Sequence, residues 1–73
     1  MPMTEEHLTT EELNALLCED RIVACPVCVE AGEDGDYCRS QVLRRPEDNH
    51  FYAFHAIAGH VVCLSTIQIV YSA

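Results

Sequence analysis

Basic side chains are scarce in this 73-residue chain. It contains no lysine, and its four arginines stand against twelve acidic residues, which gives a formal net charge of −8. Non-specific binding of nucleic acid releases counterions through Lys and Arg contacts, and docking on anionic membranes uses the same residues. The composition therefore argues against both, and it suits either plain solubility or a partner with a basic surface.

Long apolar runs and a signal sequence are also lacking. The most apolar stretch, residues 61–71, contains Ser65, Thr66 and Gln68 and is too short and too polar to cross a bilayer. The N-terminus is acidic and polar, unlike a signal peptide. We therefore expect no membrane contact and a reducing cytoplasm around the chain.

The length limits the chain to one small domain over residues 1–73, in which we expect residues 1–8 to be flexible. It is too short for a Rossmann unit or a barrel enzyme, and we expect no enzymatic activity. Thr9 and Glu12 form a capping box, and leucines at helical spacing follow. This pattern predicts a helix that ends near Glu19 or Asp20.

Strand-like segments follow the helix, rich in β-branched or aromatic residues and separated by polar loops. They cover residues 21–25, 37–43, 51–57 and 61–71. The order of elements predicts an α+β domain with one short N-terminal helix and then a small sheet of three or four strands. The cysteines suggest a zinc ion as the group that stabilises such a small core.

Five cysteines in a reducing compartment are thiols or metal ligands rather than disulfides. In the segment Cys25-Pro26-Val27-Cys28, two thiolates can reach one metal from a tight turn. Cys38 is the candidate third ligand, and zinc is the one cofactor that the sequence indicates. The fourth ligand is left open among His50, His55, His60 and Cys63. A second C-x-x-C pair, which would make a full zinc ribbon, is missing.

Two other interpretations of these residues stay open. The cysteines are ordinary buried or surface thiols, or Cys25 and Cys28 form a redox pair, although the chain lacks the βαβ context of such pairs. Three histidines recur every five residues, a spacing that matches neither one helix face nor one strand face. We interpret them as exposed or core-edge side chains rather than ligands.

The basic residues are unevenly distributed. Arg39, Arg44 and Arg45 lie close together in the sequence and predict one basic patch on an acidic body. Such a patch is either a contact for a partner carboxylate or phosphate, or it pairs internally with Glu47 and Asp48. A surface of both signs suits a specific protein–protein contact.

Four features of the chain together resemble one family. They are the acidic segment MTEEHLTTEELNALL, the basic set made of arginines alone, the CPVC turn and the small size. It is the family of small RNA-polymerase-binding transcription regulators of lytic Xanthomonas phages. The resemblance implies a non-enzymatic protein of the host bacterial cytoplasm that binds host RNA polymerase near the RNA exit region. It further implies transcription inhibition at initiation and antitermination, that is, read-through of terminators.

On this hypothesis the partners are host RNA polymerase subunits, with no membrane and no direct sequence-specific binding of nucleic acid. The contacts we expect are Glu5, Glu6, Glu11, Glu12, Arg39, Arg44 and Arg45. The alternative is a small zinc-bound module that holds nucleic acid through its arginines and aromatic residues. A further alternative is an inhibitor of another host nucleic-acid complex, such as a defence nuclease.

Overall fold

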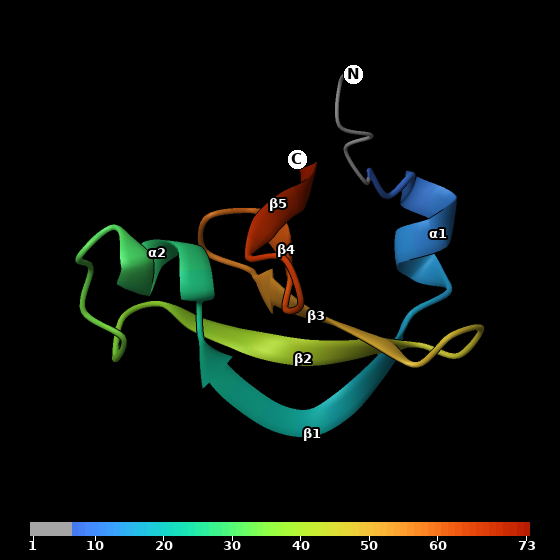
Figure 1. The fold of residues 1–73 in the computed structure, drawn as a ribbon, viewed down its shortest axis with the longest axis horizontal. Coiled ribbons are helices and arrows are strands. Elements are labelled where there is room, and N and C mark those ends of the chain that lie inside the picture. Colours follow the sequence, from blue (N-terminus) through green and yellow to red (C-terminus); the bar gives the residue numbers. More distant parts are fainter. Residues whose placement is uncertain (1–6) are drawn as a thin grey trace.

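An antiparallel sheet of five strands dominates the computed structural model, which describes residues 7–73 (Figure 1). The strands are β1 (Leu17–Ala24), β2 (Arg39–Arg45), β3 (His50–His55), β4 (His60–Cys63) and β5 (Gln68–Ser72), and the helices are α1 (Thr10–Asn14) and α2 (Pro26–Glu30). Each strand pairs with its neighbour in sequence, in the order β1-β2-β3-β4-β5. The predicted α+β class is confirmed, with five strands in place of three or four.

Helix α1 begins as the sequence predicts but ends earlier. The Thr9 hydroxyl accepts a hydrogen bond from the Glu12 backbone N–H at 3.1 Å, and the Glu12 carboxylate accepts one from the Thr9 N–H at 3.2 Å. The helix stops at Asn14, so the predicted end near Glu19 or Asp20 is wrong. Those two residues belong to β1, which pairs with β2 on both sides of an irregularity between Cys18 and Ile22, and this pairing overrides a weak local preference.

The C-terminal apolar run is a hairpin rather than one strand. Residues 61–71 divide into β4 and β5 around a turn in which Ile67 has a φ of 55°. The two strands then pair with each other, and Val61 lies opposite Tyr71. A continuous β-branched run carries no strong turn residue, so the prediction of a single strand missed this break.

The sheet buries apolar side chains on both faces because successive strand residues point to opposite sides. Tyr52 and Ala53 are neighbours in β3, and both are fully buried. One face carries the cluster Leu8, Leu43, Tyr52, Val61, Cys63 and Val70, against which Leu13 of α1 packs. The other carries Cys25, Cys38, Ala53 and Val62, against which residues of α2 pack. The second cluster contains two cysteines, and a third, Cys28, packs against it.

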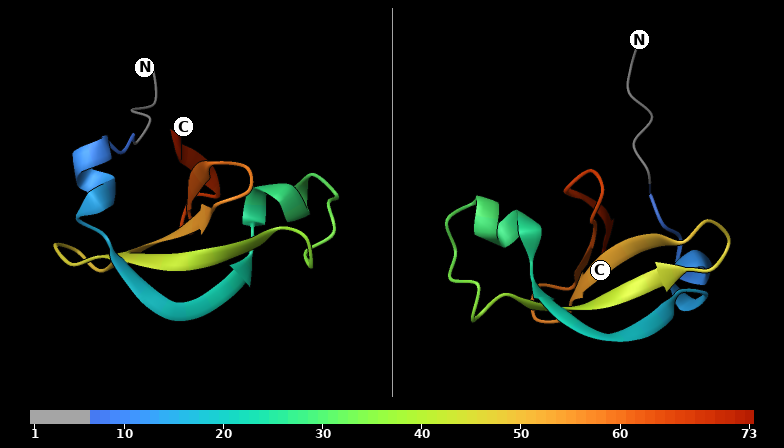
Figure 2. Two further views of the ribbon diagram at one scale, coloured as in Figure 1. Left: turned by 180° about the vertical axis from the view of Figure 1, so that it is seen from behind. Right: turned by 60° about the horizontal axis from the view of Figure 1, so that its bottom comes forward.

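The two helices lie at opposite ends of the sheet in each view (Figure 2). Leu8, within the segment expected to be flexible, is buried, and its N–H donates to the Val70 carbonyl at 2.8 Å. Residues 1–6 of that segment lie outside the described residues. Over residues 7–73, neither helix has the length and apolar content needed to cross a membrane.

Candidate metal centre

Two cysteines and two histidines converge at the α2 end of the sheet. One ligand atom from each of Cys25, Cys28, His55 and His60 lies within 4.8 Å of the other three. The Cys25 Sγ lies 3.3 Å from His60 Nε2, and the Cys28 Sγ lies 3.7 Å from His55 Nδ1. These four residues lie close enough to hold a metal ion.

The spacing of the four atoms matches tetrahedral coordination. Bonds of about 2.3 Å to sulfur and about 2.0 Å to nitrogen place the ligands of a tetrahedral zinc ion about 3.3–3.8 Å apart. The two sulfur–nitrogen contacts fall inside this range, and the longest separation in the group exceeds it by about an ångström. A small contraction of the side chains would therefore complete the geometry.

The two cysteines are positioned by the junction between β1 and α2. Cys25 is the N-cap of α2, and Pro26 occupies the first helical position, where its missing N–H costs nothing. The Cys25 N–H donates to the Cys38 carbonyl, and the Cys25 carbonyl accepts from Val29 N–H at 3.0 Å. These bonds hold the fully buried Cys25 between the helix and the start of β2.

The two histidines are positioned by the β3–β4 hairpin. His55 ends β3, His60 begins β4, and the two are direct cross-strand partners. Gly59 closes the turn with a φ of 72°, and its N–H donates to the His55 carbonyl at 2.8 Å. The rings of His55 and His60 meet edge to face, with centroids 5.1 Å apart. Two histidines that are five residues apart in the sequence therefore meet across the turn of the hairpin.

This arrangement differs from our interpretation of the histidines. His50 is exposed at the far end of β3, as expected of a surface residue, but His55 is only 4% exposed and His60 is half-buried. The spacing was tested against a single helix or strand face, whereas the relevant relation is between paired strands. The turn signal Ala58-Gly59 between the two histidines was the feature that could have revealed it.

The environment of the site favours neutral side chains. Burial raises the pKa of the Cys28 thiol to about 12, and hydrogen bonds and charge repulsion involving Cys25 and Cys38 act in the same direction. Burial also lowers the pKa of His60, with repulsion from His55 contributing. A neutral imidazole is the form that binds metal, and a cation would stabilise the thiolates that burial disfavours.

Cys38 was predicted as a ligand and is outside the group of four. It is nevertheless buried in the same cluster as Cys25, and Cys28 packs against that cluster. Cys63 is buried on the opposite face of the sheet, in the cluster around Tyr52. All five cysteines are free thiols.

The three arginines of the expected basic patch are separated. Arg44 and Arg45 are consecutive in β2, so they point to opposite faces. Arg44 pairs with Glu19 at 3.0 Å, and Arg45 pairs with Asp48 at 2.8 Å. Arg39 is exposed at the other end of the strand.

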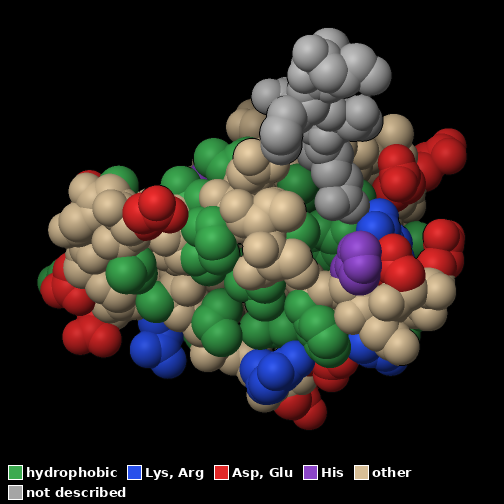
Figure 3. All heavy atoms as spheres, viewed as in Figure 1, with side chains coloured by type: hydrophobic (Ala, Val, Ile, Leu, Met, Phe, Trp, Pro, Cys, Tyr) green, Lys and Arg blue, Asp and Glu red, His purple; other side chains and the backbone are tan. Residues whose placement is uncertain are grey.

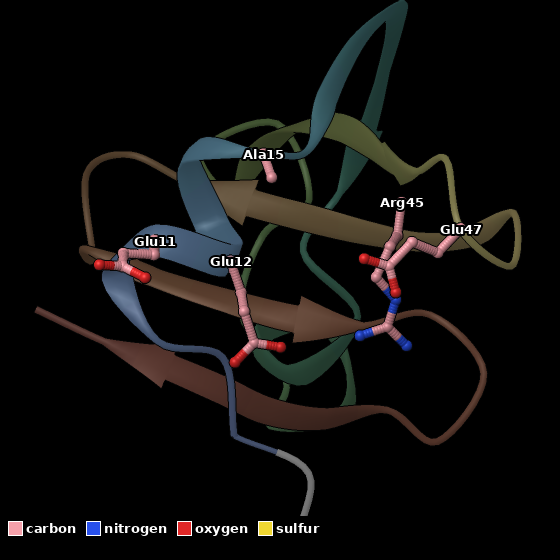
Figure 4. A pocket seen from close by; sticks show the side chains of 5 residues that line it. All are labelled: Glu11, Glu12, Ala15, Arg45 and Glu47. Atoms are coloured by element: carbon pink, nitrogen blue, oxygen red, sulfur yellow. The ribbon is translucent and has the colours of Figure 1, made fainter.

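Two of the expected acidic contacts lie next to Arg45. A hollow of about 190 Å³ is lined by Glu11, Glu12, Ala15, Arg45 and Glu47. Figure 4 shows Glu12 of α1 and Arg45 of β2 reaching toward this space from opposite sides. The other two expected acidic contacts, Glu5 and Glu6, lie outside the described residues.

Acidic side chains gather at both ends of the face shown in Figure 3, and hydrophobic side chains cover its middle. One acidic end corresponds to the loop between α2 and β2, the other to α1 and the β2–β3 turn. Comparison with protein-family models, with curated proteins and with solved structures finds no match to this chain.

Proposed function

We propose that this chain is a non-enzymatic binding module whose fold is fastened by one zinc ion. The observation that carries the proposal is the convergence of Cys25, Cys28, His55 and His60 within 4.8 Å. Two thiolates and two imidazoles are a donor set typical of structural zinc. Four protein ligands fill a tetrahedral ion, which leaves no position for substrate and supports a structural role.

Zinc would supply stability that a chain of this length lacks. A domain of about 60 residues buries only about 60% of its unfolded surface, so its core is marginal. Ligands that assemble only in the folded state convert the binding free energy of the metal into folding free energy. The ion would link α2 to the β3–β4 hairpin, and these two elements are far apart in the sequence.

Native mass spectrometry tests this proposal by counting zinc ions on the purified chain. We expect one per molecule, and we expect a chelator to abolish the native circular dichroism spectrum. Cys28→Ser and His60→Ala should lose the metal. The matched variants Cys18→Ser and His50→Ala should keep it, because both residues are exposed. A chain without metal whose spectrum is unchanged by chelation would contradict the proposal.

For the partner, we propose host RNA polymerase, approached near the RNA exit region in the host bacterial cytoplasm. The resemblance to phage transcription regulators supports this choice. The charge of −8 and the acidic ends of the molecule add to it, because surfaces that handle RNA are basic. Occupying such a groove would inhibit initiation and promote read-through of terminators by shifting the enzyme between its states.

An affinity pull-down with purified core polymerase tests the partner. Charge reversal at Glu5, Glu6, Glu11 and Glu12 should weaken association and flatten its salt dependence. Reversal of four acids at the end of α2 and in the loop after it, Glu30, Glu33, Asp34 and Asp36, is the matched control for the loss of charge alone. Undiminished binding by the N-terminal variant would show that the N-terminal acids do not form the contact.

Nucleic-acid binding is the less supported alternative. Arg44 and Arg45 are already engaged with carboxylates, which leaves few groups for phosphates; of the aromatic residues, Tyr52 is fully buried and Tyr37 is exposed. Filter binding at low salt would detect such an activity. If the chain captures a defence nuclease in place of polymerase, the proposal that acidic residues bind a basic surface would stand, and the target would be different.

A further inference from the structure

A third thiol lies against the four candidate ligands. Cys38 precedes β2, is 7% exposed, and shares a buried cluster with Cys25. Cys28 packs against the same cluster. Three cysteines therefore lie in one buried region, and two of them belong to the candidate metal centre.

The backbone fixes this arrangement. The Cys38 carbonyl accepts the Cys25 N–H, so the start of β2 is bonded directly to the N-cap of α2. Cys28 lies one turn into the same helix. The group of four donor atoms, Cys25, Cys28, His55 and His60, is enough for a tetrahedral ion, and Cys38 lies in the adjoining buried cluster as one donor more.

We infer that Cys38 is a third thiolate ligand that joins Cys25 and Cys28 when the centre holds a soft, thiophilic cation such as Cd²⁺. This inference rests on the proposed metal centre and extends it. Thiolates favour soft cations, whereas imidazole suits zinc equally well. A soft cation therefore gains from exchanging one histidine for Cys38, and zinc keeps the two-cysteine, two-histidine set.

The exchange balances without a redox step. The sulfur of Cys38 gives up its proton to solvent and donates an electron pair to the cation, and one histidine nitrogen leaves the cation. The departing imidazole remains neutral beside the site. No bond between sulfur atoms forms, and no oxidant or reductant is needed.

The test uses the full chain loaded with ¹¹³Cd²⁺. A proton–cadmium correlation spectrum shows scalar coupling between the metal and the β-protons of each bound cysteine. We expect coupling to Cys25, Cys28 and Cys38, and a cadmium resonance in the range of three-sulfur sites. Coupling to Cys25 and Cys28 alone would overturn the inference and leave the metal centre standing. Absence of any bound metal, zinc included, would overturn the proposed function as well.

A variant pair gives a second readout. Cys38→Ser should lose the contribution of one thiolate to the sulfur-to-cadmium absorption band while still binding one zinc ion. Cys63→Ser is the matched control, because Cys63 is equally buried but lies on the opposite face. An identical cadmium band in both variants would overturn the inference. If Cys38→Ser does not fold, the coupling between ¹¹³Cd²⁺ and the cysteine β-protons in the unaltered chain decides whether Cys38 is a ligand.

Discussion

Ser40 is the residue whose polar group is least well accommodated in the described part of the chain. It is 1% exposed, and its hydroxyl oxygen has no hydrogen-bond partner within residues 7–73. Ser40 precedes Gln41, which is paired with Phe54, the residue before the candidate ligand His55. An unsatisfied buried hydroxyl thus lies next to the candidate metal centre.

Replacing this hydroxyl should stabilise the fold. Because burying an unsatisfied polar group costs about 1–3 kcal/mol, Ser40→Ala is expected to raise the free energy of unfolding by about 1 kcal/mol. Urea denaturation in the presence of zinc measures the change, with the exposed Ser72→Ala as control. A loss of stability would show that an ordered water satisfies the hydroxyl.

Asp48 provides a prediction about pH. The Arg45 guanidinium donates two hydrogen bonds to its carboxylate, which holds the pKa of Asp48 below its usual range, and the His50 backbone N–H adds to this. The folded pKa is lower than the unfolded one. The stabilisation is therefore present above the unfolded pKa, and it is lost as the pH falls through the folded pKa.

Arg45→Gln should raise the pKa of Asp48 toward its ordinary value, because the largest cause of the lowered pKa is removed. Carbon NMR of the side-chain carboxyl group follows this titration in both proteins. Arg39→Gln is the control, since Arg39 lies at the opposite end of β2. Equal midpoints in the unaltered chain and the Arg45 variant would show that the pair does not persist in solution.

At the scale of elements, the β3–β4 hairpin decides the geometry of the metal centre. Gly59 adopts a φ of 72°, and a Cβ there would approach Ala73 at 3.5 Å, an ordinary contact. The cost of Gly59→Ala is therefore backbone strain of about 1 kcal/mol. We expect relief of this strain to shift His60 relative to His55 and to lower the zinc affinity about fivefold.

Competition with a chromogenic chelator measures this zinc affinity. Asn49→Ala is the matched control, because Asn49 has a φ of 57° in the β2–β3 turn, away from the centre. It should destabilise the fold without a specific loss of zinc affinity. Equal zinc affinities in the two variants would show that the hairpin tolerates the substitution at Gly59.

These elements also show what the sequence could reveal. Capping by Thr9 depends on neighbouring residues, so a local pattern predicted it, whereas the tight turn expected after Cys25 is the short helix α2. The early end of α1 and the division of residues 61–71 depend on strand pairing, which local preference does not encode. The pairing of His55 with His60 is likewise a cross-strand relation, and a search along a single face misses it.

At the scale of the whole molecule, charge opposes compactness. The chain carries a net charge of −8, and acids gather at both ends of the face in Figure 3. Added salt screens this repulsion over about 10 Å at 0.1 M. We expect the urea midpoint of the zinc-loaded protein to rise between low and moderate NaCl concentrations.

Neutralising loop acids should reduce this dependence on salt. The double variant Glu33→Gln, Asp34→Asn removes two charges from an exposed loop that touches neither helix α1 nor the arginine pairs. Its urea midpoint should vary less with NaCl than that of the unaltered chain. A midpoint that falls with salt would indicate that ion pairs such as Arg44–Glu19 outweigh the net repulsion.

The order of the strands has a consequence for how the chain reaches its folded state. Each strand pairs with its neighbour in sequence, and short turns join the strands from β2 to β5, so this part of the sheet can grow one hairpin at a time. The tie from Cys25 to His60 instead spans 35 residues. Metal capture therefore comes late, after three hairpins exist to present the ligands. Zinc should slow unfolding far more than it speeds folding.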